Sequence, residues 1–309
     1  MLKGKDLLSI HDLTSDEVME ILNLAHELKA KQKASIEHHI LKGKTLGMIF
    51  EKSSTRTRVS FEVGMYQLGG QALFLSNRDL QIGRGEPIKD TARVLSRYLD
   101  GVMIRTFGHE IVEEFAQYAS IPVINALTDL LHPCQALTDL LTAQEHKGKD
   151  LKGLKMAYIG DGNNMTHSLM YACAKVGMNF ASASPKGYEP NAQVVANAKL
   201  DAAQSGSTIE ILNDPFAAAK DADILYTDVW ASMGQEAEHD ERVKIFKDYQ
   251  INNELLSVAD KRAIVMHCLP AHRGEEIAED VLEKNANVIF DEAENRLHTQ
   301  KAIMALLMG

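Results

Sequence analysis

Two patterns of apolar residues alternate along the chain. Short apolar runs are typical of buried strands, and apolar residues that recur every three or four positions are typical of amphipathic helices. In the first half, the runs predict strands at 45–50, 72–76, 101–106 and 122–126. The helical pattern predicts helices at 15–31, 59–68, 88–99, 110–119 and 135–146. Strands that alternate with helices in this way form a parallel sheet covered by helices.

A second alternation of the same kind begins after the charged, glycine-containing segment 146–153, where we expect a domain boundary. Strands are predicted at 155–161, 179–184, 208–213, 223–230 and 263–270, and an apolar stretch at 287–291 precedes a last helix at 292–307. The expected fold class is therefore α/β, with two doubly wound parallel-sheet domains joined by interdomain helices. The predicted domains span 1–147 and 148–291. In such sheets, ligands bind beyond the carboxyl ends of the strands.

The composition of the chain limits the kinds of molecule that it is expected to bind and the compartment in which it is expected to work. The chain of 309 residues carries a formal net charge of -10, which argues against a sequence-independent grip on nucleic acid or on an anionic membrane. No stretch approaches the roughly 18 apolar residues of a membrane span, and the first residues lack a secretory signal pattern, so we expect a cytoplasmic protein. The three cysteines are widely spaced and odd in number, so no disulfide framework is expected.

The most informative stretch is Ser54-Thr55-Arg56-Thr57-Arg58, which lies between a predicted strand and a predicted helix. Free backbone N–H groups and the positive end of the helix dipole point to such a place, so hydroxyls and guanidiniums there can complete a phosphate cradle. The simpler interpretation is a serine or threonine N-cap beside solvated arginines. Capping needs one hydroxyl rather than three, and two arginines in a first turn oppose the dipole unless an anion is bound.

Two further motifs follow predicted strands. His132-Pro133-Cys134-Gln135, taken alone, is typical of a turn and a proline at the first helical position. The segment 159–170 suggests a dinucleotide-binding dehydrogenase, because Gly160 and Gly162 match the first two glycines of the G-x-G-x-x-G fingerprint. Met165 occupies the third place, and the next strand ends without an acidic residue for a ribose, so this alternative is weakened.

Two segments in the second half combine polar and apolar residues. The segment 228–236 is explained structurally as a loop anchored by Trp230 and Met233. The segment 266–277 raises the possibility of a zinc site made by His267, Cys268 and His272. Successive strand residues face opposite sides, which argues against that site.

Together these motifs resemble the aspartate/ornithine carbamoyltransferase family along nearly the whole chain. The resemblance implies that Arg105, His132, Asp228 and Cys268 are catalytic. It implies that carbamoyl phosphate is bound by Ser54, Thr55, Arg56, Thr57, Gln81, Arg105, His132, Pro133, Cys134, Gln135, Cys268, Leu269 and Arg296. It implies that the amino acid substrate is bound by Asn164, Asp228, Ser232 and Met233, with Asn163 as an alternative to Asn164.

The resemblance also implies the reaction, which is transfer of a carbamoyl group from carbamoyl phosphate to the δ-amine of L-ornithine, most simply in arginine biosynthesis. No metal or organic cofactor is implied. The expected assembly is a homo-trimer with shared active sites, to which Gln81 contributes from a neighbouring subunit, and the last helix, about 292–309, is expected to pack back on the first domain. A sister enzyme that acts on putrescine or a modified ornithine, and a non-catalytic binding module, remain as alternatives. The roles of His272 and Arg273 stay open.

Overall fold

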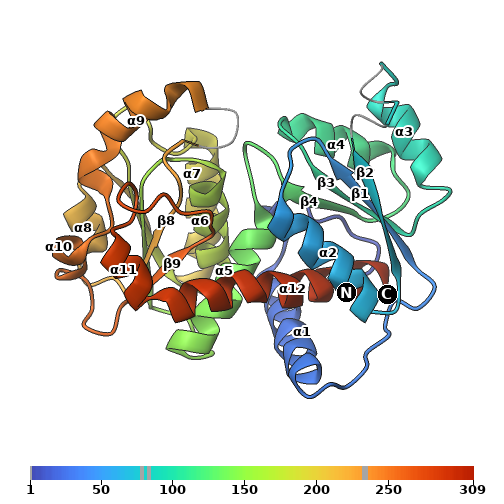
Figure 1. Ribbon diagram of the computed structural model, residues 1–309, viewed down its shortest axis with the longest axis horizontal. Coiled ribbons are helices and arrows are strands. Elements are labelled where there is room, and N and C mark those ends of the chain that lie inside the picture. The colour runs from blue at the N-terminus through green and yellow to red at the C-terminus, as the bar shows by residue number, and fades with distance from the viewer. Residues whose placement is uncertain (1, 77–79, 82–84, 232–235) are drawn as a thin grey trace. The chain divides into compact units, whose positions relative to one another are not determined.

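The computed structural model describes residues 2–76, 80–81, 85–231 and 236–309 and divides into two compact units (Figure 1). Unit 1 comprises residues 1–141 and 295–309, and unit 2 comprises residues 142–294. Each unit contains one wholly parallel sheet with flanking helices, so the expected α/β fold class is confirmed. In the described part of the chain, no helix is long and apolar enough to cross a bilayer.

Unit 1 is built on a four-stranded sheet in the order β2-β1-β3-β4. Its strands are β1 (Thr45–Phe50), β2 (Gln71–Ser76), β3 (Gly101–Arg105) and β4 (Val123–Leu127). Its helices are η1 (Ile10–Asp12), α1 (Ser15–Lys33), α2 (Thr55–Gln67), α3 (Ile88–Leu95) and α4 (His109–Tyr118). The start of α5 (Pro133–Lys147) and the end of α12 (Ala286–Met308) also belong to this unit.

Unit 2 is built on a five-stranded sheet in the order β7-β6-β5-β8-β9. Its strands are β5 (Lys155–Ile159), β6 (Asn179–Ala183), β7 (Ile209–Leu212), β8 (Ile224–Thr227) and β9 (Ile264–His267). Its helices are α6 (Asn164–Val176), α7 (Ala192–Ser205), α8 (Pro215–Ala219), η3 (Glu236–Glu238), α9 (His239–Phe246), η4 (Lys247–Tyr249), α10 (Asn253–Leu256) and α11 (Glu279–Lys284).

The last helix begins earlier than its apolar pattern predicts. Residues 287–291 lie inside α12, which starts at Ala286 rather than at residue 292. Val288 and Ile289 are buried, whereas the Phe290 side chain is 56% exposed. In a strand, Val288 and Phe290 would share one face, so their different exposure is the signature of a helix.

Strand order places a switch point in each sheet. In unit 1 the chain continues from β1 to β2 on one side and then returns to place β3 on the other side of β1. In unit 2 the same reversal separates β5 from β8. The crevice outside the carboxyl ends of the strands at such a reversal is the usual ligand site of an open α/β sheet. Ligand-binding and catalytic residues are therefore expected in the segments that follow β1, β3, β5 and β8.

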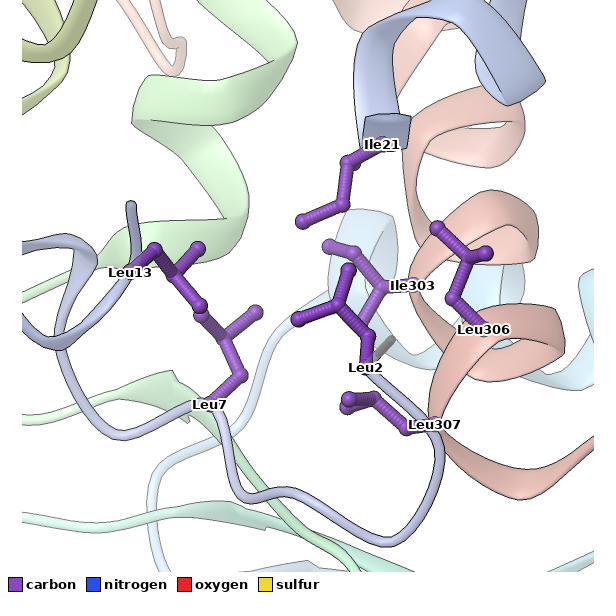
Figure 2. A pocket seen from close by; sticks show the side chains of 7 residues that line it. All are labelled: Leu2, Leu7, Leu13, Ile21, Ile303, Leu306 and Leu307. Carbon is purple, nitrogen blue, oxygen red and sulfur yellow. The ribbon is translucent and has the colours of Figure 1, made fainter. Parts of the chain in front are cut away.

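The end of α12 is anchored in unit 1 by aliphatic packing. Figure 2 shows side chains of the N-terminal segment, α1 and α12 surrounding one small apolar gap. Leu2, Ile303 and Leu307 are almost completely buried there. Burial of each such side chain contributes roughly 1.5–3 kcal/mol. This packing holds the C-terminal end of α12, the helix that also carries Arg296, within unit 1.

The buried ammonium of Lys301 on α12 is the least expected feature of this core. Its Nζ donates to Gln67 Oε1 at 2.9 Å and lies 3.0 Å from His38 Nε2. Within the described ranges no carboxylate pairs with it, and burial lowers its pKa to about 8. Burial also lowers the pKa of His38, whose Nδ1 lies 2.8 Å from the Ile36 carbonyl.

We expect Lys301→Met to remove a pH dependence of stability. Because the pKa of Lys301 falls from 10.5 to about 8 on folding, the unfolded chain binds more protons between these values. The free energy of unfolding of the wild type should therefore rise from pH 8 to pH 10.5, by about 3 kcal/mol if the full shift applies. Urea unfolding of both proteins across this range measures the difference. Parallel curves would contradict the assignment.

Candidate active site

The N-terminus of α2 gathers hydroxyl groups directly after β1. Ser54 is the N-cap, and its Oγ accepts from Thr57 N at 3.2 Å, so the capping interpretation is correct for this residue. Ser54 Oγ also donates to Thr57 Oγ1 at 3.1 Å. Thr55 begins the helix, and the helix carries no acidic residue in its first turn. The backbone N–H groups and the helix dipole at this end favour an anion.

The charges of Arg56 in α2 and Arg296 in α12 act on Arg105, so three arginines lie near one another. Two of them, Arg105 and Arg296, come from other elements than α2. Arg105 is the last residue of β3, and its backbone pairs with Phe50 of β1, so it lies at the switch point of the sheet. Arg296 of α12 donates from Nη2 to Thr57 Oγ1 at 3.2 Å and from Nη1 to Gln135 Oε1 at 2.7 Å. Both arginines are buried. Unit 1 thus brings together Thr57, Gln135 and Arg296, which are widely separated in sequence.

The Arg105 guanidinium is buried without a compensating carboxylate among the described residues. Its side chain is 5% exposed, and its Nε has no hydrogen-bond partner there. Burial, followed by the positive charges of Arg296 and Arg56, lowers its pKa to about 9. A desolvated guanidinium beside two others is unfavourable unless an anion neutralises it. This is the strongest physical indication of an anionic ligand in unit 1.

His132 enters the same cluster just before α5. Burial, followed by the charges of Arg296, Arg105 and Arg56, holds its pKa well below the ordinary value. The imidazole is therefore neutral at physiological pH and has one N–H to donate. Gln135 is held from both ends, because its Nε2 donates to Asp139 Oδ1 at 2.7 Å while its Oε1 accepts from Arg296.

The remaining predicted residues of unit 1 make fewer contacts with the cluster of buried arginines, or none that the structure describes. Arg58 turns away from the anion cluster, with its Nε 3.3 Å from Glu62 Oε2 and its guanidinium 3.9 Å from the centre of the Phe74 ring. The two-arginine argument from the first turn therefore applies to Arg56 alone. Pro133 begins α5. Gln81 is exposed. Burial raises the pKa of the Cys134 thiol to about 12, and this thiol contacts the Asn125 carbonyl.

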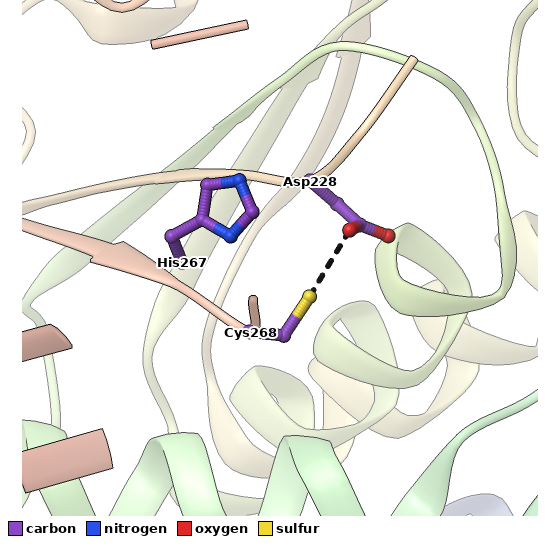
Figure 3. Close-up of side chains that lie close together, drawn as sticks. All are labelled: Asp228, His267 and Cys268. Carbon is purple, nitrogen blue, oxygen red and sulfur yellow. Dashed lines mark hydrogen bonds between the residues drawn. The ribbon is translucent and has the colours of Figure 1, made fainter. Parts of the chain in front are cut away.

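In unit 2, Asp228, Asn163 and Cys268 meet at the second switch point. Asp228 follows β8 and is buried. Its Oδ1 accepts from Val229 N at 2.8 Å and from Cys268 Sγ at 3.1 Å, the contact drawn in Figure 3. Its Oδ2 accepts from Asn163 Nδ2 at 3.1 Å. These donors hold a carboxylate in a fixed orientation, which suits recognition of a cationic amine.

Asn163 and Asn164 have different surroundings. Asn163 is the N-cap of α6, and its Oδ1 accepts from Met165 N and Thr166 N while its Nδ2 holds Asp228. Asn164 is the first residue of the helix. Both ends of the Asn163 amide are thus engaged within the protein.

The zinc argument based on strand alternation was wrong in its premise. β9 ends at His267, so Cys268 lies beyond the strand, and donor atoms of Asp228, His267 and Cys268 lie within 4.8 Å of one another. The His267 ring is nevertheless engaged. Its Nδ1 accepts from Leu269 N at 2.8 Å, and its Nε2 lies 3.1 Å from Glu276 Oε1. With Nδ1 taken by a backbone N–H, His267 supports the segment that follows β9 and has no lone pair left for a metal.

Glu276 and Leu269 shape this segment. Glu276 is fully buried, and its Oε1 also accepts from His272 N at 2.6 Å. Sequence reasoning missed Glu276, because the sequence does not show that this carboxylate folds back onto His267. Leu269 has φ of 58°, a left-handed conformation that costs a non-glycine residue about 1–2 kcal/mol. Such local strain is found mainly at functional sites.

The second glycine of the dinucleotide-like motif, Gly162, is explained by packing. A Cβ on Gly162 would lie 2.3 Å from Pro190 N and 2.6 Å from Tyr188 O. The Gly162 N–H donates to that same carbonyl at 2.9 Å. Gly162 therefore allows close approach of residues 188–190, and a bound dinucleotide is not needed to account for it.

Arg242 of α9 links the segment after β5 to the segment after β8, a contact that the sequence analysis did not predict. Its Nη1 donates to Asp161 Oδ2 and to the Trp230 carbonyl, both at 2.9 Å. Burial raises the pKa of Asp161 to about 6, although Arg242 opposes that rise. Predicted residues Ser232 and Met233 follow Trp230 and lie outside the described residues.

We expect Arg242→Met to weaken amino acid binding and to destabilise the protein. The change leaves the Asp161 carboxylate buried beside Asp228 without its guanidinium, a loss of about 3–5 kcal/mol. Urea unfolding measures that loss. Binding of the amino acid that the family resemblance implies should weaken, while anion binding in unit 1 stays unchanged. Exposed Arg262→Met provides a matched control. Equal stability and binding for the two variants would contradict the positioning role.

Two models of one protein family together match nearly the whole chain. Residues 5–145 match the family model described as aspartate/ornithine carbamoyltransferase, carbamoyl-P binding domain. Residues 152–307 match the model described as aspartate/ornithine carbamoyltransferase, Asp/Orn binding domain. Both halves of the chain are thus matched by models of one family.

Relatives match the chain over its full length. The ornithine carbamoyltransferase of Anoxybacillus flavithermus is 62% identical over 307 residues, covering 99% of this chain and 98% of that protein. That of Thermococcus kodakarensis is 57% identical, covering 100% of this chain and 98% of that protein. The solved ornithine carbamoyltransferase from Pyrococcus furiosus superimposes with a TM-score of 0.96 at 55% identity, covering 100% of this chain and 98% of that one. The chain belongs to the aspartate/ornithine carbamoyltransferase family.

Proposed function

We propose that the protein transfers the carbamoyl group of carbamoyl phosphate to the δ-amine of L-ornithine, giving L-citrulline and phosphate. The observation that carries this proposal is the buried Arg105 guanidinium at the end of β3, which has no compensating carboxylate among the described residues and fits a small dianion. Asp228 supplies the complementary feature in unit 2, a buried carboxylate that fits an ammonium group. Full-length relatives named ornithine carbamoyltransferase support the same reaction and the identity of the acceptor.

The phosphate half is assigned to the start of α2 and its arginines. Ser54, Thr55, Arg56 and Thr57 offer hydroxyl, backbone and guanidinium donors to the phosphate, and Arg296 adds a charge from α12. Pro133, Cys134 and Gln135, at the start of α5, are assigned to the carbamoyl group, together with Leu269 and Cys268 of unit 2. Charge-assisted hydrogen bonds to phosphate oxygens are the strong kind, which suits a ligand that must later leave as an anion.

The carbamoyl oxygen acquires negative charge as the amine attacks. Arg105, neutral His132 and Thr57 are assigned to donate to that oxygen, which makes them an oxyanion hole. The low pKa of His132 matters here, because a neutral imidazole donates a hydrogen bond without competing for the phosphate. One such donor is worth about 3–4 kcal/mol in the transition state. The carbon–oxygen bond to phosphate breaks as the carbon–nitrogen bond forms, and Arg56 stabilises the departing phosphate.

The attacking amine must first lose a proton, because a free alkyl ammonium has a pKa near 10.4. Asp228 and Cys268 are assigned to steer that loss, and the departing phosphate is the final acceptor. Asn164, Ser232 and Met233 are assigned to the amino acid portion of ornithine. Since both ends of the Asn163 amide are engaged, Asn163 is assigned to orient Asp228 rather than to bind ornithine. The phosphate is itself an activated leaving group, so the proposal includes no metal and no organic cofactor.

The stoichiometry of the reaction tests this proposal. Purified protein supplied with carbamoyl phosphate and ornithine should release one phosphate for each citrulline formed. Arg93→Met, an exposed arginine of unit 1, serves as the matched control for Arg105→Met. Phosphate release that does not require ornithine would point to a hydrolase instead.

Assembly is proposed from the exposed face of unit 1. β2 is an edge strand with exposed Phe74 on the side of α2, and α2 exposes Val59 and Tyr66, the latter 79% exposed. An exposed apolar face of this extent favours an interface between copies of the chain. The proposed assembly is a homo-trimer in which Gln81 of one subunit reaches the carbamoyl phosphate site of the next.

Subunit mixing tests the shared site. Gln81→Ala and Arg105→Met should each have low activity alone. After random reassembly of an equimolar mixture, about a quarter of all sites should regain activity, because those sites receive both native residues. The readout is turnover of the mixture against the mean of the separate variants. No gain on mixing would place Gln81 and Arg105 in the same subunit's site or remove Gln81 from it.

A biosynthetic role in a cytoplasmic setting is proposed as well. A structural relative from Campylobacter jejuni, 45% identical with a TM-score of 0.91, is described as an anabolic ornithine carbamoyltransferase and covers 97% of this chain and of its own. The formal net charge of -10 gives no basis for a nucleic acid partner.

A further inference from the structure

Two histidines and a carboxylate that the proposed reaction does not use lie together in unit 2. His239 is the first residue of α9, and His272 and Glu275 belong to the turn beyond β9. His239 Nε2 lies 3.1 Å from Glu275 Oε2, and His272 Nδ1 lies 3.3 Å from that same oxygen. One ligand atom from each of the three residues lies within 4.8 Å of the other two.

These spacings match the edges of a small coordination polyhedron. Zinc binds imidazole nitrogen at about 2.0–2.1 Å and carboxylate oxygen at about 2.0–2.2 Å in tetrahedral geometry. Two ligand atoms of such a tetrahedron are about 3.3–3.5 Å apart, as follows from those bond lengths. The separations of 3.1 Å and 3.3 Å therefore need little change to admit an ion. Two imidazoles and one carboxylate also leave a fourth position for water.

The surroundings hold two of the ligands in orientation. Asp240 Oδ1 lies 3.4 Å from His239 Nδ1, on the opposite side of the ring from Glu275. A carboxylate at the second ring nitrogen is the usual support of a metal-bound histidine, because it fixes the tautomer that presents the other nitrogen. The turn is fixed by its backbone, since Glu275 N donates to His272 O at 2.9 Å. Gln250 Nε2 donates to the Glu275 carbonyl at 2.8 Å.

A simpler explanation is a pair of surface hydrogen bonds, in which both imidazoles donate to Glu275. In that case both rings share the single oxygen Oε2, with their centres 5.8 Å apart. A divalent ion at the same place binds one nitrogen of each ring and that oxygen. The side chains are 35%, 42% and 29% exposed for His239, His272 and Glu275, so an ion can enter from solvent.

We propose that His239, His272 and Glu275 form a binding site for a divalent first-row transition metal ion, with zinc the best fit. The donor set of two imidazoles and one carboxylate suits zinc, whereas magnesium and calcium favour oxygen ligands. The ion joins the first turn of α9, six residues after Met233, to the segment that carries Cys268. The site is independent of the proposed carbamoyl transfer.

Cobalt and zinc binding to the metal-stripped protein at about pH 7.5, where an ordinary imidazole is neutral, tests this site. We expect one Co²⁺ per chain with a tetrahedral visible spectrum, no thiolate charge-transfer band, and displacement by Zn²⁺. His239→Gln and His272→Gln should each weaken binding at least about tenfold, because each removes a ligand. His39→Gln, a half-exposed histidine of unit 1, is the matched control and should bind as the wild type does.

Cys268→Ser separates this site from the neighbouring group of Asp228, His267 and Cys268. The proposal requires Co²⁺ binding to persist in Cys268→Ser. A thiolate band, or binding that Cys268→Ser abolishes and His239→Gln does not affect, would place the ion at the cysteine and overturn the proposal. Failure of the wild type to bind either ion would overturn it as well.

Discussion

Replacement of Arg105 by methionine is expected to lower kcat by about two to three orders of magnitude, the usual effect of losing one oxyanion-hole donor. Methionine matches the length of the arginine stem but donates no hydrogen bond. The same change should increase the free energy of unfolding without ligand, because it removes a buried guanidinium that has no carboxylate partner among the described residues. Loss of activity together with a gain in stability is the behaviour of a strained functional group.

Steady-state kinetics and urea unfolding measure both effects in the same samples. Arg93→Met is the control, because Arg93 is exposed and its ion pair among the described residues is with Asp90 of the same helix, α3, at 3.2 Å. A second readout uses phosphate, the reaction product, which should stabilise the wild type in proportion to its binding and stabilise Arg105→Met less. Near-normal turnover, or destabilisation of Arg105→Met by several kcal/mol, would contradict the catalytic assignment.

Asp228→Asn should chiefly impair the ornithine half. The amide keeps the shape of the carboxylate but not its charge, and the lost pairing with an ammonium group is worth roughly 2–5 kcal/mol. KM for ornithine should therefore rise about 30-fold or more. The KM for carbamoyl phosphate and its protection against unfolding should stay unchanged, because the anion cluster of unit 1 is untouched.

Asp248→Asn is the matched control, since it removes an exposed negative charge from unit 2. It should leave both KM values as they are. The Cys268 thiol also donates to Asp228 Oδ1 at 3.1 Å. In Asp228→Asn, the side chain has one oxygen instead of two, so this hydrogen bond is kept only if that oxygen faces the thiol. Equal effects of Asp228→Asn on the two substrates would remove Asp228 from ornithine recognition.

The fold was largely predictable because apolar periodicity is local information. The predicted β1, β3 and β4 each begin or end within two residues of the observed strands, and the two-sheet fold class is confirmed. The prediction failed at 287–291, where a short apolar run is compatible with either a strand or a buried helix face. The domain bounds 1–147 and 148–291 remain predictions, and the assignment of residues 295–309 to unit 1 is in keeping with a last helix that returns to the first domain.

The site was predictable where residues follow strands and begin helices, as at Ser54 and His132. Contacts between distant segments were not, because a sequence does not show which carboxylate faces which cation. Arg242 with Asp161 and Glu276 with His267 were missed for this reason. Lys52 with Asp129 is a third such pair, with the Lys52 ammonium also 4.0 Å from the centre of the Phe107 ring. Only the resemblance to a family gave His132 and Arg105 their roles.

The measurement that tests the central claim most directly is a competition among acceptors. The protein receives carbamoyl phosphate labelled in the carbamoyl group, together with ornithine, putrescine, N-acetylornithine and aspartate at equal concentrations. Asp228 and the segment around Ser232 predict that label enters citrulline almost exclusively. Preferential labelling of another acceptor would contradict the assignment of the ornithine-binding residues. Absence of label in every acceptor would contradict the proposed carbamoyltransferase activity.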